Sequence, residues 1–380
     1  MEKNEIITVY GKDPAEMAIK LAEAADLAEL ISSRFLHSAN LSPGSGKSDV
    51  PLRKVRIGLK PNLVVSRPAQ GGATTHPEIA AALISYLRKN GFDNIAIIEG
   101  SWAGDSTSRA FSACGYLDLA KETGVELIDT QADKAVVCDC KGMKIEICES
   151  ALAVDFMINL PVLKGHCQTL LTCALKNNKG IIPDREKRRF HSLGLHKPIA
   201  HLNTVARNDF IIVDGICGDL DFEEGGNPLY AGRMFASMDP VLCDAWAAEL
   251  MGYSLGEIPY IALAEKLGVG VTGPVSLREI NKSTETSALP KPQGKVNQLS
   301  AFIGEDNACS PCYAGLVYAL SRLGRSERER LDKVCIGQGF KGKKGKTGVG
   351  QCTAAFTASC PGCPPTGQEI LVFLKRQIRL

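Results

Sequence analysis

VRIGLKPN (residues 55–62) opens the stretch that decides the fold of this 380-residue chain, and it is followed by HPEIAAALISYLRKNG (76–91) and NIAIIEGS (94–101). The first and third segments are short apolar strands that end in polar residues. The second has the apolar periodicity of a helix, with Pro77 in its first turn and Gly91 at its end. Short strands separated by a helix of this length indicate parallel βαβ units.

The same alternation continues along the chain and predicts an α/β fold: a mostly parallel sheet with flanking helices, plus a small C-terminal Cys-rich metal module. Further strands are expected at 125–129, 156–160 and 210–214, a hairpin around Lys141-Gly142, and helices at 14–35, 170–175 and 239–251. The predicted division is an N-terminal helix and linker at 1–53, an α/β core at 54–271, a second linker at 272–297 and the Cys-rich module at 298–380.

Composition limits the class of protein. Hydrophobic residues make up 44% and charged residues 23% of the chain, as in soluble globular proteins. We find no run of about 20 apolar residues that could span a bilayer and no apolar stretch typical of a signal peptide at the N-terminus. The sequence therefore predicts a cytoplasmic protein whose 14 cysteines stay reduced.

Five cysteines near the C-terminus predict a metal site. They are Cys309 and Cys312 in a Cys-x-x-Cys pair, Cys352, and Cys360 and Cys363 in a second pair. Four converging thiolates select zinc or an iron–sulfur cluster. The prolines around Cys363 and the long interval between the pairs favour a [4Fe–4S] cluster, with zinc or no metal as alternatives. The predicted ligands are Cys309, Cys312, Cys352 and Cys363, and Cys360 is the expected outsider.

The same segment is basic, because residues 298–380 hold twelve Lys and Arg against six Asp and Glu. Four of these lysines lie among glycines in residues 338–347, which indicates a solvated loop or, alternatively, a docking surface for an acidic redox partner protein. Without interleaved aromatic residues, nucleic-acid binding is not expected. Self-association stays open.

Polar residues at the ends of the predicted core strands form a candidate ligand site, because sites in open α/β sheets gather beyond the carboxyl ends of the strands. Lysines beside a histidine suit an anionic small molecule, and histidine can act as a general acid or base. The candidate catalytic residues are Lys164, His166 and Lys176. The candidate ligand-binding residues are Lys60, Asn62, Thr75, His76 and Asn177.

Several motifs in order resemble the domain-of-unknown-function family 362, over roughly residues 54–270. They are LKPNLV (59–64), TTHPEIAAAL (74–83), INLPVLKGH (158–166), LLTCALKNNKG (170–180), IIVDGI (211–216) and SMDPVLCDAWAAELMG (237–252). The resemblance implies an α/β architecture that is often coupled to iron–sulfur modules. Where that family commonly has Lys-Thr-His, this chain has Lys164-Gly165-His166. A fainter similarity to nickel-dependent lactate racemases, near Arg67-Pro68, concerns the fold.

Three functions follow from these patterns. The first is an iron–sulfur redox protein, active in electron transfer or as an oxidoreductase, that acts on an anionic ligand held at the strand ends. The second is a non-redox isomerase or hydro-lyase in which the cluster is a Lewis acid. The third is a non-enzymatic binding or sensor protein with a zinc staple. The sequence leaves open whether the protein is an enzyme.

Overall fold

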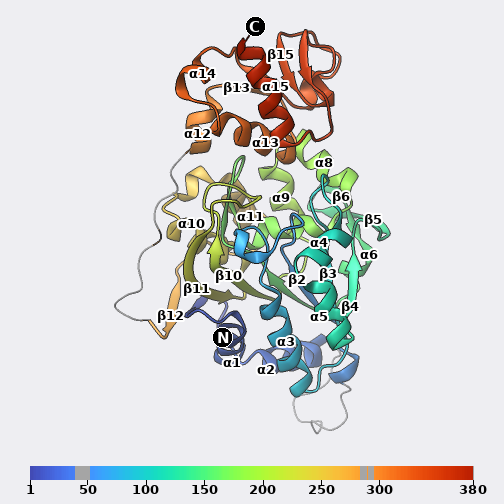
Figure 1. Cartoon of the computed structure of the whole chain (residues 1–380). Helices are drawn as coiled ribbons and strands as arrows, with labels where there is room; N and C mark the ends of the chain where they lie inside the picture. The colour runs from blue at the N-terminus through green and yellow to red at the C-terminus, as the bar shows by residue number, and fades with distance from the viewer. Residues whose placement is uncertain (39–51, 283–288, 290–294, 380) are drawn as a thin grey trace.

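The chain folds into a larger α/β body and a smaller C-terminal module that lies on one end of it (Figure 1). The structure is a computed structural model and describes residues 1–38, 52–282, 289 and 295–379. Most of the linker predicted after the N-terminal helix, and part of the second linker, lie outside the described residues. The boundaries of the predicted domains stay predictions.

A sheet of eight strands forms the centre of the body. Neighbouring strands are parallel except that β11 runs antiparallel to both of its neighbours, so the predicted mostly parallel α/β fold is confirmed. The order across the sheet is β12 (Ser276–Ile280), β1 (Glu5–Tyr10), β11 (Leu229–Ser237), β10 (Phe210–Gly218), β7 (Phe156–Leu160), β2 (Ile57–Pro61), β3 (Ile95–Glu99) and β4 (Glu126–Asp129).

Helices cover both faces of this sheet and bury its apolar side chains in two separate clusters. One face packs against α1 (Pro14–Ala24), α2 (Leu27–Ser38), α3 (Pro77–Lys89), α4 (Thr107–Ala113) and α5 (Tyr116–Thr123). The other packs against α7 (Ala174–Asn177), α8 (Asp184–Ser192), α9 (His196–Leu202), α10 (Pro240–Leu250), α11 (Pro259–Lys266) and the hairpin of β5 (Ala135–Cys140) and β6 (Met143–Cys148). Strands buried on both faces explain the near-continuous apolar runs in the sequence.

Two predicted helices differ from the structure. The segment predicted as one helix over 14–35 is two helices, because Asp26 adopts a left-handed conformation with φ 51° between α1 and α2. The apolar run predicted to open a helix at Leu170 is instead strand β9 (Leu170–Thr172), which pairs with β8 (Lys164–His166). That run shows no helical periodicity of its own, so the tertiary pairing with β8 decides its structure.

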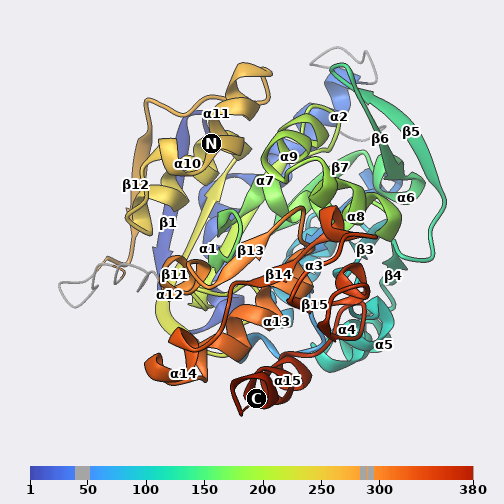
Figure 2. The same cartoon turned by 90° about the horizontal axis from the view of Figure 1, so that it is seen from above.

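The C-terminal module contains a second, smaller sheet in which all strands are parallel: β13 (Ile303–Glu305), β14 (Val334–Ile336), β15 (Thr347–Val349) and β16 (Ala358–Cys360). Around it lie α12 (Lys295–Ser300), α13 (Ser310–Ser321), α14 (Arg325–Glu329) and α15 (Gly367–Arg379). Helices α13 and α15 pack on one another and build a third apolar cluster. Seen from above, the module covers one side of the body, with α14 and α15 at its edge (Figure 2).

Among the helices of the described residues, none is both long and apolar enough to cross a bilayer.

Candidate functional site

The order of the core strands reverses at β2, and the candidate site lies at this point. From β2 the chain proceeds outward through β3 to β4, and it then returns to place β7 on the other side of β2. A crevice opens beyond the carboxyl ends of the strands where the order reverses, and ligands of open α/β sheets bind there. Lys60 and Asn62 stand at the end of β2, and Asn159 stands near the end of β7.

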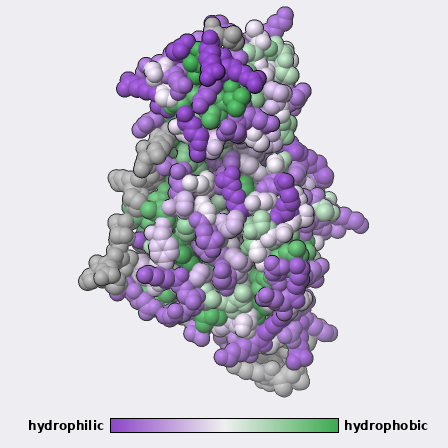
Figure 3. Space-filling view, viewed as in Figure 1, coloured by the Kyte–Doolittle hydropathy of each residue, from purple (hydrophilic) through white to green (hydrophobic). Residues whose placement is uncertain are grey.

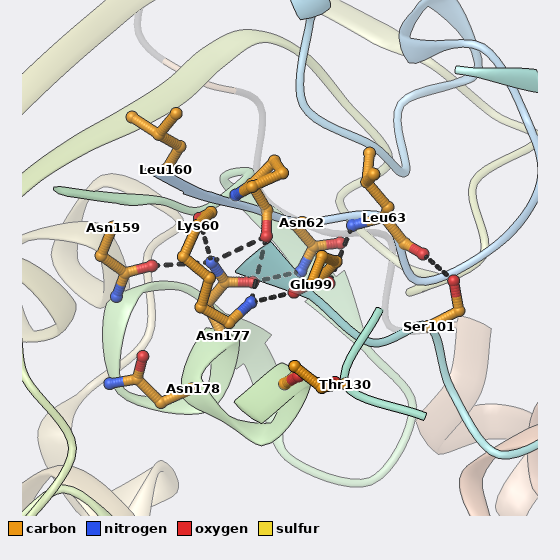
Figure 4. A network of polar contacts seen from close by, with 12 residues as sticks. Lys60, Asn62, Leu63, Glu99, Ser101, Thr130, Asn159, Leu160, Asn177 and Asn178 are labelled. Carbon is orange, nitrogen blue, oxygen red and sulfur yellow. Dashed lines mark hydrogen bonds and ion pairs between the residues drawn. The ribbon is translucent and has the colours of Figure 1, made fainter. Parts of the chain in front are cut away.

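Lys60 and Glu99 form a buried ion pair at this point. The Lys60 ammonium also donates to the carbonyl of Pro61 (3.0 Å), and Glu99 accepts a further hydrogen bond from the backbone N–H of Leu63 (3.1 Å) (Figure 4). Burial lowers the pKa of Lys60, and Glu99 opposes that shift. Because both charges are paired, Lys60 fixes the ends of β2 and β3 relative to one another.

Asparagine side chains join the strand ends to helix α7. Asn62 donates to Asn177 (2.8 Å), and Asn177 donates to Asn159 (2.7 Å) (Figure 4). Thr75 accepts from the backbone of Asn62 (2.8 Å) and donates to the carbonyl of Leu160 (2.7 Å). Buried polar groups that are satisfied in this way hold one arrangement firmly. The network therefore gives the site a rigid floor.

Lys164 and His76 are held by the protein itself. The Lys164 ammonium donates to the side chain of Asn62 (2.9 Å) and to the carbonyls of Ala73 and Glu223 (2.9 Å to the latter), so all three of its protons are used. Burial, with the nearby Lys176, lowers the pKa of Lys164 to about 7. His76 contacts Asp214 through Nδ1 (2.8 Å); burial alone would lower its pKa, but the carboxylate raises it overall.

Lys176 and Lys179 have no such partners. Among the described residues, no carboxylate lies within ion-pair distance of either ammonium, and the contacts are Thr172 for Lys176 (3.5 Å) and His191 for Lys179 (3.4 Å). Both side chains are half-buried, and both line the same cavity. Burial lowers the pKa of Lys176 to about 8 and the pKa of Lys179 well below its usual value. Two lysines without a carboxylate partner at a cavity wall suit an anionic ligand, because a bound anion would raise their pKa values again and stabilise the ammonium forms.

His166 has a defined tautomer. Its Nδ1 accepts hydrogen bonds from the backbone N–H groups of Gln168 (3.0 Å) and Thr169 (3.2 Å). Burial, together with Lys176, lowers its pKa well below the usual range, so the ring is neutral and its proton is on Nε2. Nε2 lies 3.4 Å from a carboxylate oxygen of Glu223 and 3.4 Å from Ser310 of the module. His166 is thus a hydrogen-bond donor in the crevice.

The four cysteines predicted as ligands come from loops that follow the strands of the small sheet. Cys309 follows β13 and is the N-cap of α13, and Cys312 lies in the first turn of that helix. Cys352 follows β15, and Cys363 follows β16. The carboxyl ends of parallel strands meet at one edge of a sheet, and a helix N-terminus favours negative charge. This fold therefore gathers thiolates that are widely separated in sequence.

The thiols influence each other strongly. Burial, followed by the neighbouring Cys309, Cys363 and Cys352, raises the pKa of Cys312 to about 12. Cys309 is shifted in the same direction by burial, Cys352 and Cys363. A bound metal removes this repulsion, because thiolates are its ligands. The fifth cysteine, Cys360, is buried in the apolar cluster of the module, and the only hydrogen-bond partner of its sulfur among the described residues is the carbonyl of Pro361 (3.9 Å).

The edge of the small sheet and the strand ends of the body enclose one cavity of ≈ 1060 Å³, part of it open to solvent. Cys309, Cys312, Cys352 and Cys363 line one wall. The facing wall is lined by residues of the body that include Asn62, His166, Lys176, Asn177 and Lys179. Lys60, Thr75, His76 and Lys164 are not part of the lining and lie behind it. The roles predicted for all these residues stay predictions.

The residues present fit an iron–sulfur cluster better than a single zinc ion. In tetrahedral zinc sites with Zn–S bonds of about 2.3 Å, the sulfur atoms lie about 3.8 Å apart. No three of these four sulfur atoms lie within 4.8 Å of one another in the described structure. In a four-iron cluster each thiolate binds a different iron atom, so the ligands lie farther apart. Gln338 donates to the sulfur of Cys309 (3.6 Å), as hydrogen bonds to cluster ligands do.

Two other groups of side chains have the composition of metal sites. His166, Cys167 and Glu223 offer ligand atoms within 4.8 Å, as do Cys173, Cys243 and Asp244. The first group does not suit a cation, because the ring nitrogen that faces Glu223 already carries the proton, and because Lys176 lies nearby. The second is fully buried in the core. We assign a metal to neither.

Residues that the sequence analysis did not select also line the cavity. Glu223 accepts from the backbone and the thiol of Cys167 (both 3.1 Å). Lys187 donates to the carbonyl of Ser101 (2.7 Å). Gln338 bridges the lobes through the carbonyl of Arg188 (3.3 Å). Of these residues, only Glu223 stands in a recognisable sequence pattern, an acidic pair followed by Gly225-Gly226. Its proximity to His166 depends on the position of a loop, which the sequence pattern does not predict.

Comparison with known proteins identifies the family and gives limited functional information. Residues 57–249 match the family described as "Domain of unknown function (DUF362)". A relative, the thylakoid-associated protein sll1697 of Synechocystis sp. (strain ATCC 27184 / PCC 6803 / Kazusa), is 24% identical over 243 residues, which cover 61% of this chain and 74% of that protein. The apoprotein of lactate racemase from Thermoanaerobacterium thermosaccharolyticum aligns with a TM-score of 0.40 and 12% identity, over 66% of this chain and 57% of that enzyme.

Proposed function

We propose that this chain, which belongs to the family described as Domain of unknown function (DUF362), is an iron–sulfur redox protein that acts on a small anion. In this proposal Cys309, Cys312, Cys352 and Cys363 hold a four-iron cluster, and Lys176 and Lys179 hold the anion opposite them. The observation that carries the proposal is the shared cavity, in which four thiols and two unpaired ammonium groups form facing walls.

The surroundings of the thiols support a cluster. Four thiolates around an iron–sulfur core leave a net negative charge, and cations beside the site offset it. Lys179 and Arg188 are close enough to Cys309 to lower the pKa of its thiol against the effect of burial. The cluster, when bound, supplies one-electron chemistry. The protein would stabilise a bound cluster through these two cations, the N-terminus of α13 and the side chain of Gln338.

The body contributes binding and orientation of the anion. Lys176 and Lys179 supply charge, the Nε2–H of His166 supplies a directed donor, and the asparagine network holds the floor of the cavity in place. Lys164 acts behind this wall, where it fixes the loop that carries Glu223. Charged hydrogen bonds of this kind contribute about 1.5–3 kcal/mol each. A carboxylate or phosphate of small size is therefore the expected ligand class.

Anaerobic purification tests the cluster directly. We expect a brown protein that absorbs near about 400 nm and holds about four irons and four sulfides per chain. A colourless protein with one zinc per chain would contradict the proposal and favour a zinc staple. EPR with candidate anions separates the alternatives further, since an anion that perturbs the spectrum without electron transfer would favour a Lewis-acid function.

Cys352 and Cys360 form a matched pair for the ligand assignment. We expect Cys352→Ser to lose most of the bound iron, because its sulfur lines the cavity. Cys360→Ser should keep the iron content and the spectrum of the wild-type protein, because its sulfur lies outside the cavity. Equal iron loss in both variants would contradict the assignment. Thermal unfolding of both variants controls for misfolding.

A further inference from the structure

The proposed cluster site has an inner and an outer side. Cys309 and Cys312 lie at the N-terminus of α13, and Lys179 of the body is near Cys309. Cys363, in contrast, is exposed to solvent, and the Cys352 thiol is close to Lys341 of the module. The site is therefore accessible from solvent at Cys363.

The outer side is bordered by a stretch of the chain that contains no acidic residue. Residues 333–368 contain five lysines and no Asp or Glu, and this stretch includes Cys352 and Cys363. Four of the lysines (Lys341, Lys343, Lys344 and Lys346) form the loop 341–346, and all four are exposed. On the face shown in Figure 3 the module has hydrophilic residues around a hydrophobic patch.

The loop is held beside the cluster ligands. Gln338–Phe340, immediately before it, packs beside Gln351–Thr353, which contains Cys352. The ring of Phe340 contacts the ring of Phe356 edge-on, at 5.7 Å between centroids. Lys343 and Lys346 pair with Asp306 (3.3 Å) and Asp332 (3.2 Å) at exposed positions. In the described part of the chain, Lys341 and Lys344 have no ion-pair partner.

We propose that loop 341–346 and the exposed edge at Cys352 and Cys363 form the docking surface for an acidic one-electron carrier protein of the ferredoxin type. The inference rests on the proposed function. In each encounter the reduced carrier loses one electron and the cluster gains it, with no bond made or broken. Complementary charge speeds such encounters and orients them. Nucleic acid fits less well, because the half-buried Phe340 packs edge-on against Phe356 and the Lys343 ammonium lies over its ring, 5.6 Å from the centroid.

The test uses the iron-loaded protein and a reduced plant-type [2Fe–2S] ferredoxin as probe. A triple variant, Lys341→Glu, Lys343→Glu and Lys344→Glu, is compared with a control that makes the same charge change on the body, Lys54→Glu, Lys197→Glu and Lys266→Glu. We expect the rate of cluster reduction at low salt to fall by about tenfold or more in the loop variant only, and to lose its salt dependence. Equal rates in both variants would overturn the docking surface.

A second readout does not depend on electron transfer. Carbodiimide should join carboxylates of the ferredoxin to lysines of loop 341–346, as located by mass spectrometry, and cross-links confined to the body would overturn the inference. A short DNA duplex that displaces the ferredoxin and binds more tightly would do the same. Reduction by dithionite checks the cluster: if the protein holds iron and dithionite reduces it, a failure with ferredoxin concerns docking alone. A preparation without iron overturns both proposals.

Discussion

Lys176 and Lys179 hold two ammonium groups at the wall of one cavity, where no carboxylate of the described residues pairs with either. A partly desolvated charge without a partner is unfavourable, and an anionic ligand compensates for it. Lys60 does not line the cavity, and its charge is neutralised within the protein by Glu99. This contrast distinguishes the lysines that we expect to bind the anion, Lys176 and Lys179, from Lys60, which supports the structure of the site.

Lys176→Met should weaken binding of the anion by about tenfold to a hundredfold, because a charged hydrogen bond is lost. Because the pKa of Lys176 is about 8, its charge is present below that pH and is lost as the pH rises through it. Affinity in the wild-type protein should therefore fall above pH about 8. Calorimetric titration with small carboxylates and phosphates checks both effects. The control is Lys197→Met, at an exposed position of α9.

His166 should stay neutral with its proton on Nε2 across physiological pH. Two backbone N–H groups occupy Nδ1, and burial disfavours the charged ring. Long-range ¹H–¹⁵N spectra of the metal-free protein should show this tautomer without titration between about pH 5 and 8. A ring that gains a second proton in that range would indicate a general acid or base rather than a fixed donor.

At the scale of elements, the short strand β8 determines where Glu223 lies. Gly165, in the middle of β8, is pressed against the backbone of Leu220: a Cβ on Gly165 would lie 2.2 Å from that carbonyl oxygen. The backbone of Gly165 also donates to the carbonyl of Asp219 (2.8 Å). The loop after β10 can reach the cavity because this position has no side chain. The close approach of the Leu220 backbone explains why residue 165 is a glycine.

Gly165→Ala should therefore destabilise the protein by about 1–3 kcal/mol, as overpacking does, and should weaken anion binding because the loop that carries Glu223 must move. Gly256→Ala is the matched control, since no atom outside its immediate neighbours lies within 4 Å of a Cβ at that position. Thermal unfolding and calorimetric titration of both variants measure the two effects. If Gly165→Ala unfolds and binds like Gly256→Ala, the loop is not held in this way.

Elements with a strong local pattern could be predicted from the sequence, and elements fixed by long-range pairing could not. The helix predicted at Pro77–Lys89 and the strand at Phe156–Leu160 have the bounds of α3 and β7. In contrast, β1 was not predicted, because its place in the sheet depends on β11 and β12, which are distant in sequence. The small sheet of the module was predicted only in part, since residues 334–337 and 349–352 were interpreted as strand-like segments on either side of the lysine loop. Its strands have three residues each, too few to show a periodicity.

The candidate site likewise has features that could be predicted from the sequence and features that could not. The chemistry of its cysteines and lysines could be inferred from residue type and spacing. Their arrangement into facing walls depends on two parallel sheets whose carboxyl edges are turned toward each other, and nothing local in the sequence specifies that. Glu223 and Gln338 also could not be predicted as cavity residues, because each is positioned by a contact with a segment that is distant in sequence.

For the whole molecule, the connection between body and module is small and specific. Gln168 of the body donates to Glu305 (2.8 Å) and to the carbonyl of Ala308 (3.0 Å) of the module, and Ser310 donates to Gln168 (2.7 Å). Cys167 and Phe222 of the body pack on the apolar cluster of the module. Residues of both lobes line the cavity, so a molecule bound in it can contact both.

Removal of the metal should therefore loosen the loops of the module and leave its helices intact. The apolar cluster around α13 and α15 includes Leu316, Leu320, Ile370 and Leu374, and it contains none of the four ligand cysteines as buried members. We expect hydrogen exchange after chelation to accelerate at residues 309–312 and 350–363, where the thiols no longer have a shared partner, while α15 and β7 keep their protection. If protection is lost throughout α13–α15, the metal is what folds the module, as in zinc-stapled domains. That outcome would favour a structural site over a redox site.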